Sequence, residues 1–191
     1  MKKILLVITL VISALLSEVN AQKQIIFEGV TIPRTITCQN KTLQLNGAGS
    51  RSKMWVDVYI QALYLSQLSQ NPKEIINDNT EMSIRIEITS ALVSSGKLTR
   101  AMHTGFEKSA GDRFKALEPK IELLKSYLAE EITRGDVFEL TYNPTGSSVW
   151  VVKNGELKGK VEGFEFKKVF FGIWLGDNPV DEELKNSLLG L

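Results

Sequence analysis

The sequence predicts an α+β fold, in which a large antiparallel sheet carries a helical layer on one face. Two observations lead to this prediction. Strand-like segments come in runs near both ends of the chain, with helical segments between and after them, so strands and helices do not alternate regularly. In addition, Asn154-Gly155 separates two strand-like runs, which indicates a tight antiparallel hairpin because both turn residues take a positive φ.

The strands are predicted from a period-two alternation of apolar side chains. They are expected at residues 25–30, 35–39, 42–45, 54–65, 82–89, 138–142, 149–152 and 157–161. In the 54–65 segment, one face is apolar and includes Val58 and Ile60, whereas Tyr59 and Gln61 point to the other side. This strand therefore presents two chemically different faces.

Helical spacing of apolar residues predicts four helices. The first runs from Leu98 to Ser109, and Pro119 suits the first turn of a second helix that continues to Ile132. Glu165–Leu175 predicts a helix that ends near Gly176, and Pro179 opens a last short helix through Leu189.

The N-terminus has the three-part pattern of a secretory signal peptide over residues 1–21. A basic start, Met1-Lys2-Lys3, precedes an apolar run, and Val19 and Ala21 occupy the small-residue positions before a cleavage expected between Ala21 and Gln22. The run is shorter than the roughly 20 residues that span a bilayer, so a retained membrane anchor is the less favoured alternative. We expect one domain, 22–191, in the periplasm or fully secreted, without stable membrane insertion.

Composition argues against several function classes. Without residues 1–21 the acidic and basic side chains balance, which disfavours nucleic acid or an anionic membrane surface as the main partner. With one histidine and one cysteine, and without phosphate-loop, dinucleotide or serine-elbow motifs, no metal, no cofactor and no catalytic residue are predicted. We interpret Cys38 as a small buried hydrophobe and His103 as a solvated surface residue.

A glycine-rich stretch is the best candidate for a ligand site. Residues 45–51 predict a tight turn that ends in Arg51 and leads into the strand of Tyr59. An arginine offers a planar fork of donors to a carboxylate, and Tyr59 has the strand parity to add its hydroxyl. An ordinary surface arginine beside a half-buried tyrosine is the simpler interpretation of these residues taken alone.

The order of several motifs resembles the chalcone isomerase family over most of residues 24–191. Gly47–Arg51 followed by Tyr59–Leu65 resembles its N-terminal core, and Phe170–Asp181 resembles the ending of its bacterial chalcone isomerase-like branch. Gly135-Asp136 and the Asn154-Gly155 hairpin fit that branch. The resemblance implies an open-faced β-sandwich with a ligand cleft between the large sheet and the helices.

The resemblance also assigns residues to that cleft. Arg51 takes the place of the cleft arginine of the plant enzymes, and Tyr59 that of a threonine. Leu98 and Gly105 stand where the enzymes carry a tyrosine and an asparagine, and Gly172 lies close to their last cleft threonine. Since neither Leu98 nor Gly105 can donate a side-chain hydrogen bond to a developing enolate, the resemblance is closer to non-enzymatic relatives similar to fatty-acid-binding proteins. The other residues expected to line the cleft are Trp55, Gln61 and Met102.

We therefore expect an exported binding protein for a fatty acid or a similar carboxylate amphiphile. In it, Arg51 and Tyr59 would hold the carboxylate while apolar side chains cover the tail. Two alternatives stay open: an isomerase or lyase acting on a small unsaturated substrate with Arg51 as its electrophilic group, and a partner-binding envelope protein with a vestigial cleft.

Overall fold

A seven-stranded antiparallel sheet dominates the structure, a computed structural model that describes residues 23–38, 40–53 and 56–191. The predicted signal peptide and Trp55 lie outside the described residues. Each strand pairs with its neighbour in sequence. The strands are β3 (Thr35–Cys38), β4 (Lys41–Lys53), β5 (Val56–Leu65), β6 (Met82–Ile88), β7 (Val137–Asn143), β8 (Ser148–Lys153) and β9 (Glu156–Glu162).

The sheet curls into a half-barrel. Cys38 on β3 places its Sγ 3.7 Å from Oγ1 of Thr141 on β7. In a flat sheet these two strands would lie about 19 Å apart, because each step between neighbours is about 4.8 Å. Oγ1 of Thr141 also lies 2.8 Å from the Ser83 hydroxyl on β6. These contacts require strong curvature.

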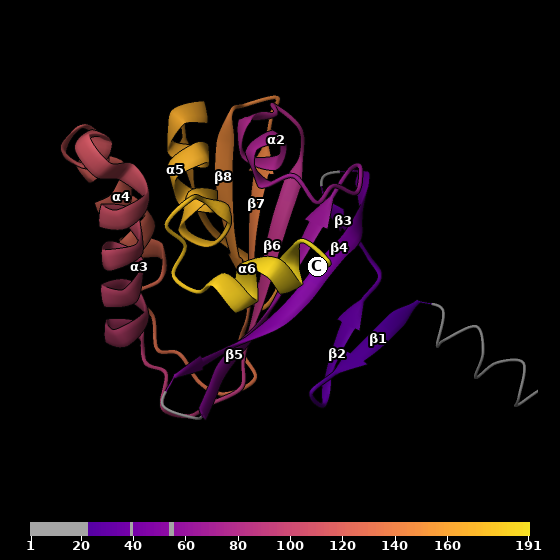
Figure 1. Cartoon of the computed structure of the whole chain (residues 1–191). Helices are drawn as coiled ribbons and strands as arrows, with labels where there is room; N and C mark the ends of the chain where they lie inside the picture. Colours follow the sequence, from indigo (N-terminus) through magenta and orange to yellow (C-terminus); the bar gives the residue numbers. More distant parts are fainter. Residues whose placement is uncertain (1–22, 39, 54–55) are drawn as a thin grey trace, which may run out of the picture.

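Helices cover one face of the sheet (Figure 1). They are α2 (Pro72–Asn77), α3 (Ser95–Ala110), the 3₁₀ turn η1 (Gly111–Arg113), α4 (Phe114–Tyr127), α5 (Phe164–Leu175) and α6 (Glu182–Leu188). The central helix is α5, which contacts α2, α3 and α6 and is buried over most of its length. Its Phe166, Phe170 and Trp174 pack with Phe106 of α3 in one aromatic cluster. The predicted α+β class and the large antiparallel sheet with a helical layer are confirmed.

A two-stranded hairpin, β1 (Gln24–Phe27) and β2 (Val30–Pro33), packs on the other side of the large sheet. One continuous strand at 25–30 was predicted, and this was wrong. Glu28 and Gly29 take φ values of 48° and 80°, as a two-residue hairpin turn requires. The hairpin covers Ile60 and Tyr64 of β5, so that strand is buried on both faces.

The predicted tight turn at 45–51 is also wrong, because Gly47, Gly49 and Arg51 lie inside the long strand β4. The glycines serve packing. A Cβ atom on Gly47 would lie 2.2 Å from the Ser187 carbonyl oxygen of α6, and one on Gly49 would lie 2.7 Å from the Ser187 Cβ. Only residues without a side chain let α6 approach β4 this closely.

Two helix boundaries differ from the prediction. The second long helix begins at Phe114 rather than at Pro119, because η1 carries the chain directly from α3 into α4 and leaves Pro119 inside the helix. That helix ends at Tyr127 rather than near Ile132. The short helix α2 was not predicted, although Asn71 caps its N-terminus and Pro72 follows in the first turn.

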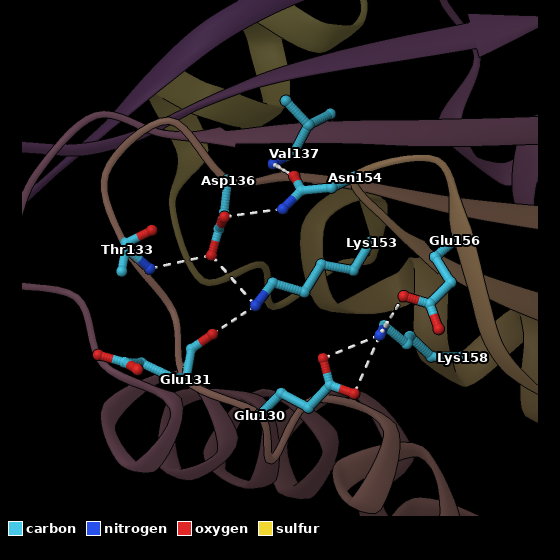
Figure 2. A network of polar contacts seen from close by, with 9 residues as sticks. All are labelled: Glu130, Glu131, Thr133, Asp136, Val137, Lys153, Asn154, Glu156 and Lys158. Carbon is cyan, nitrogen blue, oxygen red and sulfur yellow. Dashed lines mark hydrogen bonds and ion pairs between the residues drawn. The ribbon is translucent and has the colours of Figure 1, made fainter.

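A polar network joins the loop before β7 to the β8–β9 turn (Figure 2). Asp136 accepts hydrogen bonds from the Thr133 amide and from Nδ2 of Asn154, and pairs with Lys153 at 3.1 Å. Burial opposes ionisation, yet these hydrogen bonds outweigh it and hold the pKa of Asp136 below its ordinary value. Asn154 and Gly155 have positive φ, so the predicted hairpin turn is confirmed. We interpret this network as structural, because the charges of Asp136 and Lys153 are paired with each other.

A buried lysine caps the C-terminus of α2. Lys167 of α5 is fully buried, and its Nζ donates to the carbonyl oxygens of Ile75, Ile76 and Asp78 at 2.7–2.9 Å. These carbonyl groups would otherwise be unsatisfied at a helix C-terminus. Desolvation lowers the pKa of Lys167 to about 8. No helix among the described residues is both long enough and apolar enough to cross a bilayer.

Candidate functional site

Arg51 and Tyr59 face each other across two strands. They are direct partners in the antiparallel register of β4 and β5, and opposite residues of such a pair project to the same side of the sheet. That side carries α5 and α6. The sheet register therefore brings together the two residues that the sequence singled out.

Arg51 already holds a carboxylate. Its Nη1 lies 2.7 Å from Oδ2 of Asp181 and donates a second bond to the Ser52 carbonyl oxygen at 2.6 Å. The arginine and aspartate side chains are only 28% and 20% exposed. Asp181 is also the N-cap of α6, because its Oδ1 accepts from the Leu184 amide at 3.0 Å.

The Tyr59 hydroxyl is a protonated donor beside this pair. Nε1 of Trp174 on α5 lies 3.5 Å from it, a distance at the outer limit of a hydrogen bond. Burial raises the pKa of Tyr59, and the contact with Trp174 and the charge of Arg51 offset only part of that effect. The hydroxyl thus stays neutral at physiological pH and keeps its proton available for an acceptor.

Gln61 continues the same face of β5, two residues beyond Tyr59. It is fully buried, and neither its Oε1 nor its Nε2 has a hydrogen-bond partner among the described residues. Its β4 partner is Gly49, over which α6 packs. A buried amide without partners is costly, so this position departs from ordinary core packing.

Helix α6 covers the site and is fastened at both ends. The Arg51–Asp181 ion pair holds its N-terminus, and Nδ2 of Asn46 donates to the Leu188 carbonyl oxygen at 2.9 Å near its C-terminus. Lys185 of α6 also donates to the Gly176 carbonyl oxygen at the end of α5. Figure 1 shows α6 lying across β4 and β5. At this place α6 packs directly on the sheet.

The other residues expected to line the cleft lie elsewhere in the helical layer. Met102 is buried in the main core, Leu98 packs at its edge, and Gly105 lets α3 approach α5, since a Cβ there would lie 2.8 Å from Ile173. Gly172 contacts Ser109 and borders a separate hollow of about 370 Å³ that includes neither Arg51 nor Tyr59. Leu98 and Met102 thus share the main core with Tyr59, whereas Gly172 borders a hollow away from it.

The remaining reactive side chains show no catalytic arrangement. His103 is half-buried, with its ring edge against Phe114 and its Nε2 3.6 Å from Glu107. Burial raises the pKa of the Cys38 thiol, which disfavours the reactive thiolate. Among residues that the structure describes, no group of three histidine, cysteine or acidic side chains is placed to hold a metal ion.

Sequence reasoning missed Asp181 and Trp174 as members of the site. Asp181 precedes a helix, so its capping role has a local signal in the sequence. Its contact with Arg51, 130 residues away, has none. Trp174 lies within a motif that identified the family resemblance, but helical periodicity does not show which strand it meets.

Comparison with known proteins agrees with the observed architecture. A sequence model of the family described as chalcone isomerase-like matches residues 24–190. Among solved structures, the fold is similar to that of a fatty-acid-binding protein from Arabidopsis thaliana, with a TM-score of 0.73 and 17% identity. The match covers 87% of this chain and 95% of the plant chain, and at this identity the likeness concerns the fold. No curated protein sequence matches significantly.

Proposed function

This chain belongs to the chalcone isomerase-like family, and on that premise we propose that it is an exported, non-enzymatic binding protein for a fatty acid or a similar carboxylate amphiphile. One observation carries the proposal: the Arg51 guanidinium binds a carboxylate oxygen at 2.7 Å, and Arg51 is the register partner of Tyr59 on the same side of the sheet. The similar plant structure, a fatty-acid-binding protein, supports the same ligand class.

The ligand carboxylate would replace that of Asp181. Arginine presents several donors in one plane, and Tyr59 adds a neutral hydroxyl on the same side of the sheet. The tail would then lie along the helix-facing side of β5, beyond Tyr59. This side is apolar around Leu63 and Trp174, as burial of an acyl chain requires.

The helical layer supports binding over isomerisation. Leu98 and Gly105 offer no side-chain donor or acceptor, and both lie in the packing of α3. Electrostatic stabilisation of an enolate requires donors aimed at the developing charge, and each is typically worth about 3–4 kcal/mol. We therefore assign Arg51 and Tyr59 to ligand recognition.

The test is uptake of a labelled fatty acid by the mature protein, residues 22–191, and by two variants. Arg51→Ala removes the partly exposed ionic contact with the ligand carboxylate and should weaken binding about fivefold. Arg134→Ala removes an exposed arginine from a loop and serves as the matched control, with binding unchanged. Equal affinity of the wild type and Arg51→Ala would refute the proposal.

A partner-binding protein with a closed cleft is the second candidate function. It is favoured by the fact that Arg51 is already paired with Asp181 beneath α6. In that case neither the wild type nor Asp181→Asn, which removes the carboxylate paired with Arg51, would take up fatty acid. The binding function instead requires Asp181→Asn to bind fatty acid at least as well as the wild type.

A further inference from the structure

A second hollow lies beside α5. The hollow of about 370 Å³ opens between α2, α3 and α5, and its size is at the lower end of the range for small-molecule pockets. Gly172 and Ser109 meet within it. A Cβ on Gly172 would lie 2.4 Å from the Ser109 hydroxyl, so the missing side chain at Gly172 keeps this surface concave.

Four cationic side chains from different helical segments line the hollow. They are Lys73 of α2, Lys108 of α3, Arg113 of η1 and Lys168 of α5. Among the described residues that line it, Asp177 is the one acidic side chain. The whole chain has a formal net charge of only +1, so this concentration of positive charge is local.

The cations are incompletely neutralised by the protein. Arg113 and Lys168 share a single carboxylate, that of Glu165. Lys73 and Lys108 form no ion pair with any residue in the described part of the chain. The hollow therefore keeps an excess of positive charge that faces solvent.

Two of the uncharged side chains around the cations already donate within the protein, so the cations are the main donors left for an anion. The Ser109 hydroxyl donates a hydrogen bond to the Val169 carbonyl oxygen at 2.6 Å, and the Asn77 amide donates to the Lys73 carbonyl oxygen within α2. The side chain of Asn178 also borders the hollow. Ile76 and Leu175 add apolar surface beside the charges.

We propose that this hollow binds the phosphate group of a small phosphorylated molecule. A phosphate ester carries nearly two negative charges at neutral pH, which matches a hollow lined by four cationic residues better than a single carboxylate does. Lysine binds phosphate as a point charge, and the planar guanidinium of Arg113 can donate two parallel hydrogen bonds. The site is separate from Arg51 and Tyr59, so it stands whether or not the chain binds fatty acids.

The test uses pyrophosphate as the probe. Its binding to the mature protein, residues 22–191, is measured by the shifts of backbone amide NMR signals. Saturable shifts are expected at Ser109, Gly172 and Gly176, which border the hollow. The double variant Lys73→Gln/Lys108→Gln should weaken binding about tenfold, since it removes two solvent-exposed ionic contacts. The control Lys97→Gln/Lys115→Gln makes the same change in charge on exposed lysines outside the hollow and should leave the affinity unchanged.

Binding to lipid vesicles distinguishes a soluble phosphorylated ligand from the phosphate of a lipid headgroup. Binding of pyrophosphate with these variant effects supports a soluble phosphorylated ligand. If only vesicles of phosphatidylcholine mixed with phosphatidic acid bind, while pure phosphatidylcholine does not, and the double variant abolishes that binding, the phosphate belongs to a lipid headgroup. No response to either probe, or equal loss in the control variant, overturns the proposal.

Discussion

Replacing Asp181 by asparagine tests whether the Arg51 site is closed by an internal competitor. Asparagine is as good an N-cap as aspartate, so the bond to the Leu184 amide and the start of α6 should persist. The change removes the negative charge that faces Arg51 at 2.7 Å. A ligand carboxylate would then bind Arg51 without first displacing another carboxylate.

The expected magnitude follows from the partial exposure of the pair. A hydrogen bond between charged groups contributes about 1.5–3 kcal/mol when buried, whereas a solvent-exposed ion pair contributes about 0.2–1 kcal/mol. With side chains 28% and 20% exposed, we take about 1 kcal/mol. Asp181→Asn should thus bind fatty acid about fivefold more tightly while losing at most about 1 kcal/mol of unfolding free energy.

Titration calorimetry with a soluble fatty acid and urea denaturation of the same samples measure both quantities. Asp181→Ala is the matched variant, because it also removes the cap and should lose about 1 kcal/mol more stability than Asp181→Asn. Weaker binding by Asp181→Asn, with its stability intact, would refute the competition between Asp181 and the ligand.

Three further predictions concern stability. Gly47→Ala should destabilise the protein by about 1–3 kcal/mol, because its Cβ would lie 2.2 Å from the Ser187 carbonyl oxygen. The control Gly96→Ala in α3 meets no atom within 4 Å and should be neutral or stabilising. Equal effects of the two variants in urea denaturation would exclude the glycine–α6 contact as the cause. Gln61→Met should raise the unfolding free energy of the ligand-free protein by about 1–3 kcal/mol by removing two unpartnered buried amide atoms, and a loss of stability would mean that the amide is satisfied. The unfolding free energy should rise between pH 8 and about 10, because Lys167 has a folded-state pKa of about 8 against an ordinary value of 10.5, so the unfolded state binds more protons in that window. Above pH 10 the raised pKa values of Tyr59 and Tyr64 should reverse this trend, and Lys167→Met should lack the initial rise.

The sequence was sufficient for elements with a strong local signal. The alternation from Met82 to Ile88 and the Asn154-Gly155 turn predicted β6 and the β8–β9 hairpin correctly, because each signal lies within a few residues. The Glu28-Gly29 turn was missed because glutamate rarely takes a positive φ. The glycines of β4 led to the wrong prediction of a turn, because glycines indicate a turn locally. Their role here is contact with α6, about 140 residues later in the chain.

The candidate site was predictable only in part. Arg51 and Tyr59 are eight residues apart, and strand pairing across a hairpin brings them together. The contacts that decide the state of the site, Asp181 on Arg51 and Trp174 on Tyr59, come from the C-terminal helices. Such contacts depend on how α5 and α6 pack, and no local pattern encodes that arrangement.

In the proposed binding function, the carboxylate of Asp181 would change what drives ligand binding at Arg51. A partly buried arginine without a counterion would be costly, and Asp181 supplies that counterion in the ligand-free state. A ligand carboxylate then exchanges one ion pair for another, so the net gain must come mainly from burying the tail, at about 0.8 kcal/mol for each methylene. Affinity should therefore rise roughly fourfold for each added methylene, which a calorimetric series of saturated acids measures. An affinity independent of chain length would show that Arg51, rather than an apolar cleft, dominates binding.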